Sequence, residues 1–172
     1  MNLANKSDLV TVLSFVYHTM RASVPLLRFA LLHDMSDELR EYYNQHIGEE
    51  AGHDDMLLQD LYALGVEPLP LTFFAAQFAG SQYYLIAHEH PALLLGYMRA
   101  LESESFTEAE VDNLCQIHHV ELSAMRHHAI HDPLHCRDID EQIARLSASL
   151  QTRVRWNEAE VNKMMRGTDG VQ

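Results

Sequence analysis

Two short segments of the chain carry metal-binding residue types in the order histidine, carboxylate, histidine at positions i, i+4 and i+7. They are His46, Glu50 and His53 in the first segment and His128, Asp132 and His135 in the second. On an α-helix, the three side chains of each segment point within about 40° of one direction. Imidazole and carboxylate ligands suit iron, manganese or zinc, and mixed sets with open positions suit non-heme iron. The segments therefore predict two helices that face each other across a metal site.

The first segment offers more than one choice of ligand. Glu50 and His53 lie one helical turn apart, the spacing with which carboxylate-bridged di-iron proteins hold a metal from one helix. Glu49 is a competing ligand because it lies four residues before His53, but only Glu50 shares the direction of both His46 and His53. We therefore expect Glu50 and His53 to be ligands, with His46 and Glu49 as supporting groups or alternative ligands.

A site for two metals needs a bridging carboxylate from a further helix, and Glu102 is the candidate. It follows an apolar helical face that includes Leu94 and Met98, so its side chain is expected to point inward. A buried carboxylate without a partner is costly, so an inward Glu102 would need a cation. The alternative is that Glu102, like Glu104, is an exposed glutamate at the end of a helix.

The composition favours helices, since only 7 Gly and 5 Pro occur among 172 residues, and this length suits one domain with its own core. We predict an all-α, single-domain protein over residues 1–172, with a frayed tail at 167–172. Thr107 and Glu110 form a capping-box pattern at the start of one helix. The predicted helices cover residues 8–32, 37–64, 72–88, 92–103, 107–131, 138–152 and 157–165.

Two local features remain open. Pro133 disfavours the helical conformation at Asp132, so either the helix kinks there or Asp132 caps a new helix that starts at Pro133. Tyr83, Tyr84 and Tyr97 are expected to be core aromatics, with the lining of a pocket near the metals as the alternative.

The charge and the termini limit the classes of partner. A formal net charge of −13 argues against nucleic acids and anionic membrane surfaces, which require a basic face. Cys115 and Cys136 lack a metal-type spacing and are interpreted as reduced thiols. The N-terminus lacks the pattern of a secretory signal, and no apolar stretch approaches the ~20 residues that span a bilayer. We expect a cytoplasmic protein, with a homodimer as the default assembly.

The segments HIGEEAGHDDMLLQDLYALG, PALLLGYMRALES and HHAIHDPLH resemble the heme-oxygenase-like di-iron oxidases and oxygenases. In that family, a helix with Glu and His, a Glu on a later helix and a His-x3-Asp-x2-His segment supply the ligands. Some members carry their first carboxylate seven positions before the histidine, where this chain has His46, so Glu50 is expected to serve instead. The resemblance spans about residues 17–146 and implies six ligands, namely Glu50, His53, Glu102, His128, Asp132 and His135.

The resemblance also implies a fold and a reaction. The expected fold is a heme-oxygenase-like helical bundle of about seven helices that binds no heme. Two Fe(II) ions are expected as cofactor, although manganese or an iron–manganese pair suits the same ligands. Dioxygen would be the co-substrate, and an electron donor would supply reducing equivalents. The expected reaction is C–C cleavage, decarboxylation or N-oxygenation of a small carboxylic acid or amino acid.

Two other functions fit the same residues. In a metal-free enzyme, similar to thiaminase-like hydrolases or to cofactor-free oxidases of a quinone precursor, the histidines and acids would be general acid–base groups. In a non-enzymatic protein, the histidine-rich face would store or sense metal, or bind a partner. Chelation separates the first alternative from the di-iron enzyme, and consumption of dioxygen separates the second.

Overall fold

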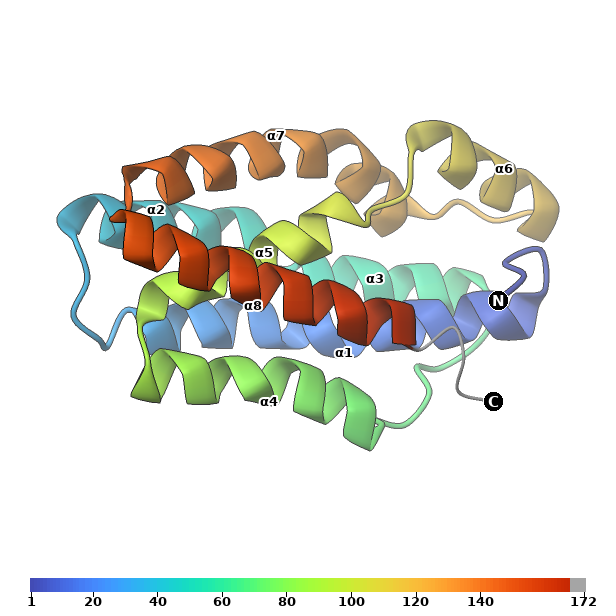
Figure 1. Ribbon diagram of the computed structural model, residues 1–172. Coiled ribbons are helices and arrows are strands. Elements are labelled where there is room, and N and C mark those ends of the chain that lie inside the picture. Colours follow the sequence, from blue (N-terminus) through green and yellow to red (C-terminus); the bar gives the residue numbers. More distant parts are fainter. Residues whose placement is uncertain (168–172) are drawn as a thin grey trace.

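The computed structural model describes residues 1–167, which form eight α-helices, one 3-10 helix and no strand (Figure 1). The all-α prediction is therefore confirmed, whereas the predicted frayed tail falls, after Gly167, outside the described residues. No helix among residues 1–167 is long and apolar enough to cross a bilayer. The α-helices are α1 (Lys6–Ala30), α2 (Asp37–Glu50), α3 (His53–Ala63), α4 (Phe73–His88), α5 (Leu94–Ser103), α6 (Glu108–His118), α7 (Ser123–Arg145) and α8 (Ala148–Gly167), and the 3-10 helix is η1 (Pro91–Leu93).

Two predicted helices are each interrupted by a residue in the left-handed conformation. Gly52, with φ of 92°, separates α2 from α3, so the predicted helix at 37–64 is wrong in its middle. His119, with φ of 54°, ends α6, and α7 begins only at Ser123, so the predicted helix at 107–131 is also wrong. Its start is confirmed, because Thr107 and Glu110 form the predicted capping box.

Pro133 neither ends nor restarts a helix. The α7 helix is continuous from Ser123 to Arg145, so the alternative in which Asp132 caps a new helix is wrong. Proline removes one backbone hydrogen bond, and packing of α7 against α5 and α3 compensates for that loss. The helix predicted at 138–152 covers the end of α7 and the start of α8, and the helix predicted at 157–165 lies within α8.

The helices pack around α5, which contacts both α7 and α8, while α1 contacts α2, α3 and α4 (Figure 1). The apolar core has two parts. One contains the first half of α2, the second half of α7 and Leu26 and Leu27 of α1. The other contains Leu9 and Leu13 of α1, Leu57 and Leu61 of α3 and the first turns of α7. The junction of α2 and α3 and the middle of α7 thus lie between the two core parts.

Gly96 allows α5 to approach α8 closely. A Cβ atom at this position would overlap the backbone of Val154 and lie 2.9 Å from the amide nitrogen of Glu158. Because backbone cannot rotate away, we expect Gly96→Ala to lower the free energy of unfolding by about 3 kcal/mol, the upper end of overpacking costs. Urea denaturation tests this value, with Gly80→Ala as the control because a Cβ at Gly80 meets nothing within 4 Å. Equal effects of the two substitutions would contradict the close packing.

Candidate metal centre

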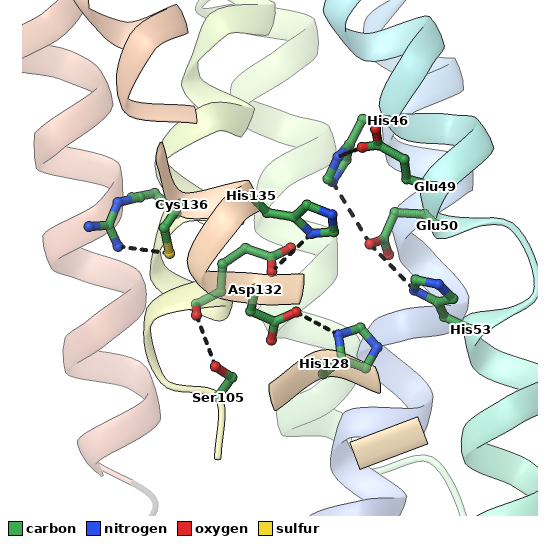
Figure 2. A network of polar contacts seen from close by, with 11 residues as sticks. His46, Glu49, Glu50, His53, Ser105, His128, Asp132, His135 and Cys136 are labelled. Carbon is green, nitrogen blue, oxygen red and sulfur yellow. Dashed lines mark hydrogen bonds and ion pairs between the residues drawn. The ribbon is translucent and has the colours of Figure 1, made fainter. Parts of the chain in front are cut away.

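The six predicted ligands lie together between the two core parts, and His46 lies with them. Their side chains come from the end of α2, the start of α3, the last turn of α5 and the middle of α7. The break at Gly52 separates Glu50 from His53, but both side chains still face α7 (Figure 2). Figure 2 shows the labelled imidazoles and carboxylates pointing toward one another: His46, Glu50, His53, His128, Asp132 and His135.

The ligand atoms form two overlapping groups that share Glu102. One group joins Glu102 to His46 and Glu50, and the other joins it to His128 and Asp132. Within each group, one atom of every residue lies within 4.8 Å of the others. Such spacing lets three side chains reach one ion, since metal–ligand bonds to nitrogen and oxygen are about 2.0–2.2 Å long. A carboxylate common to both groups is the arrangement expected for a bridging ligand.

Two histidines extend these groups. His53 Nδ1 lies 3.7 Å from Glu50 Oε1, and His135 Nδ1 lies 3.4 Å from Glu102 Oε2. His46 Nε2 approaches the same Glu50 oxygen at 3.8 Å. Glu50 therefore stands between two imidazoles, one on each side of the break at Gly52, so that Glu50 as well as Glu102 can serve two ions.

The cluster is buried, and many of its polar atoms have no hydrogen-bond partner. His46, Glu50, His53 and Asp132 are each less than 8% exposed. Buried polar atoms in proteins are almost always paired, and an unpaired one costs about 1–3 kcal/mol. Among the described residues, eight buried side-chain atoms are unpaired, and five belong to this cluster: Glu50 Oε1, His53 Nδ1, Glu102 Oε2, His128 Nε2 and His135 Nδ1. Metal ions would satisfy all five, so the residues present fit a metal centre.

The electrostatics of the cluster also favour bound cations. Burial raises the pKa of Glu102 well above its usual value, and the charges of Asp132 and Glu50 raise it further. Burial likewise raises the pKa of Glu50, but the neighbouring imidazoles of His53 and His46 outweigh it and lower that pKa well below its usual range. Without cations, burial and mutual repulsion therefore disfavour ionisation of Glu102, whereas the imidazoles favour ionisation of Glu50.

Glu49 orients His46. Its carboxylate lies 3.0 Å from His46 Nδ1, so the other ring nitrogen, which faces Glu50, is left for a metal ion. The hydrogen bond with His46 lowers the pKa of Glu49 to about 2, so the carboxylate is ionised and accepts the proton of Nδ1. Carboxylate partners of this kind fix the tautomer of metal-binding histidines. The geometry therefore suits Glu49 to a supporting role and His46 to the role of a seventh donor.

The sequence did not single out His127 as part of the site. Its ring centroid lies 4.8 Å from that of His53 and 4.3 Å from that of His131, so three imidazoles extend outward from the cluster. The i, i+4 spacing of His127 and His131 was visible in the sequence, but the contact with His53 depends on how α3 packs against α7.

A cavity of about 160 Å³ adjoins the cluster at Glu50, Glu102, His128 and Asp132. Most of its remaining lining is apolar and comes from α1, α3, α7, α8 and the segment after α5. None of the described residues that line it is lysine or arginine. The apolar lining includes Leu13, Val16, Met20, Leu57, Phe106 and Met125.

The comparisons with known proteins identify the fold. No family model matches the chain, and no curated protein matches it. A crystal structure of a domain of unknown function with a heme oxygenase-like fold, from Shewanella denitrificans OS217, is similar with a TM-score of 0.75. The match covers 91% of this chain and 73% of that chain, at 16% sequence identity. The protein thus has a heme-oxygenase-like all-helical fold, as predicted.

Proposed function

We propose that the protein is a non-heme di-iron oxidase or oxygenase that uses dioxygen to oxidise a small organic substrate. The observation that carries the proposal is the convergence of seven donor residues in which five buried atoms have no partner. Glu50 and Glu102 would be shared between two ions, His46 and His135 would serve one of them, and the remaining residues the other. Manganese, or a mixed pair, suits the same donors.

Two bound ferrous ions would supply two electrons for the reduction of dioxygen, and an external donor would restore them. The protein's own residues hold the ligands in place before metal binds. Asp132 lies 2.9 Å from His128 Nδ1, and Glu49 orients His46. The core parts on either side of the site limit the access of water to it, since His46, Glu50, His53 and Asp132 are buried. Such exclusion strengthens electrostatic interactions and limits side reactions.

The 160 Å³ cavity supports a substrate with an apolar body. At about 10–15 Å³ for each water-sized group, it accommodates on the order of ten non-hydrogen atoms. Because no lysine or arginine lines it, a substrate carboxylate would have to be received by the metal ions themselves. Of the two expected classes, the lining favours a carboxylic acid with an aliphatic or aromatic body over a polar amino acid.

The metal-free alternative keeps one specific observation in its favour. The raised pKa of Glu102, caused by burial and by the charges of Asp132 and Glu50, suits a general acid. His135 lies 3.4 Å away and could exchange a proton with it. This alternative leaves the other unpaired atoms of the cluster unexplained, which is why we prefer the di-iron centre.

Dioxygen uptake tests the proposed function. Protein loaded anaerobically with two equivalents of ferrous iron is expected to consume dioxygen faster than free ferrous iron in the same buffer, and chelation is expected to abolish the difference. His128→Ala should lose the uptake, whereas His88→Ala, at an exposed position of α4, should retain it. Substrate turnover that survives complete chelation would support acid–base chemistry, and metal binding without dioxygen uptake would support a metal-binding module.

A further inference from the structure

A second and smaller cavity adjoins the metal centre. It measures about 30 Å³ and meets the larger cavity at Glu50 and Glu102. The small cavity lies toward His46, whereas the large one lies toward His128 and Asp132. At about 10–15 Å³ for each water-sized group, it holds two or three non-hydrogen atoms. An organic substrate does not fit there, but dioxygen or a three-atom anion does.

Ser23 and Tyr97 supply hydroxyl groups to the lining of the small cavity, and Tyr97 is the more deeply buried of the two. Its side chain is 1% exposed, and its hydroxyl has no hydrogen-bond partner. Buried tyrosine hydroxyls usually find a partner, because an unpaired one lowers the stability of the fold. Burial raises the pKa of Tyr97, and the charge of Glu50 raises it further, so the phenol keeps its proton and can donate it. The rest of the lining is mostly apolar, including Leu26, Leu27, Leu94 and Met98.

We propose that the Tyr97 hydroxyl donates a hydrogen bond to a small ligand, such as dioxygen or azide, held in the small cavity at the metal centre. The inference rests on the proposed function, because the ligand needs the metal ions to bind. The site would then have two cavities with separate roles, which meet at Glu50 and Glu102. The small cavity takes dioxygen, and the large apolar cavity takes the organic substrate.

Azide binding to the iron-loaded, air-oxidised protein tests the role of Tyr97. Tyr97→Phe removes only the hydroxyl, and a hydrogen bond to a charged partner contributes about 1.5–3 kcal/mol. The dissociation constant for azide, followed by the change in the absorption spectrum, is therefore expected to rise at least about tenfold. Tyr43→Phe is the matched control, because it also removes a fully buried tyrosine hydroxyl, which donates to the carbonyl of Pro91 and does not line the small cavity. Its azide affinity is expected to stay within about twofold of wild type.

Each outcome decides one claim. Unchanged azide affinity in iron-loaded Tyr97→Phe, or an equal loss in both variants, would overturn the role of Tyr97 while leaving the metal centre intact. Failure of the wild type to take up iron would overturn the proposed function and this inference with it. A second measurement needs no variant: the infrared stretch of bound azide is expected to shift on transfer to D2O, and the absence of a shift would contradict the hydrogen bond.

Discussion

Glu102→Gln is expected to remove bound iron and to abolish dioxygen uptake. Glu102 belongs to both groups of candidate ligands. It lies in the last turn of α5 and reaches the cluster between α2 and α7. Glutamine keeps the shape of the side chain but not its charge, so both ions would lose a shared anionic ligand. Loss of partners outside the ligand shell already costs 10–100-fold in metal affinity, and loss of a shared ligand should exceed about 100-fold.

Iron content after desalting, followed by the rate of dioxygen uptake, measures this effect. Glu108→Gln is the control, since it makes the same change at an exposed position in the first turn of α6. Glu102→Gln protein that retains iron and activity at the level of the wild type would show that Glu102 is not a ligand. A loss of iron in both variants would point to general destabilisation.

In the metal-free protein, Glu102→Gln is expected to raise the free energy of unfolding, although it removes metal binding. Burial, aided by the charges of Asp132 and Glu50, raises the pKa of Glu102, so the folded state binds a proton more tightly than the unfolded state. The contribution of Glu102 to the free energy of unfolding therefore rises as the pH falls through its folded-state pKa toward about 4.5. Metal-free Glu102→Gln should be the more stable protein at pH 8, and its advantage should shrink toward pH 5.

Bound metal should reverse this pH dependence in the wild type. The ligands must be deprotonated to bind, so metal affinity falls as the pH falls. At free metal one hundredfold above the dissociation constants, two sites would add about 5 kcal/mol to the free energy of unfolding. Urea denaturation at pH 5 to 8, with and without metal, measures both trends. A metal-induced gain that does not decrease with acidification would contradict binding by these histidines and carboxylates.

The sequence predicted the fold class and named the histidines and carboxylates that lie together in the structure, because apolar periodicity and ligand spacing are local properties. The same reasoning missed the break at Gly52, since a glycine inside an apolar, helical pattern does not reveal its own φ. As a result, His46 and Glu50 lie on α2 and His53 lies on α3, so the three residues do not share one helix as the spacing predicted. Their side chains still meet.

The sequence named His46 as a supporting group or alternative ligand but could not decide between these roles, and it gave no indication of the size of the cavities. His46 occupies the position where some members of the resembled family carry a carboxylate, and its inward Nε2 depends on the hydrogen bond with Glu49 and on the stacking of Tyr42 against its ring. The choice of Tyr97 among the three tyrosines also needed the structure. Tyr84 is 63% exposed, whereas Tyr97 is buried beside Glu50. Both results depend on contacts between helices that are distant in sequence.

The number of irons bound by each chain tests the central claim most directly. The protein would be loaded anaerobically with ferrous iron, desalted and analysed for metal, and then exposed to air while its absorption spectrum is recorded. The di-iron centre predicts close to two irons per chain and a new near-ultraviolet or visible band after exposure to air. Absence of specific iron uptake would contradict it and leave the buried histidines and carboxylates as acid–base groups.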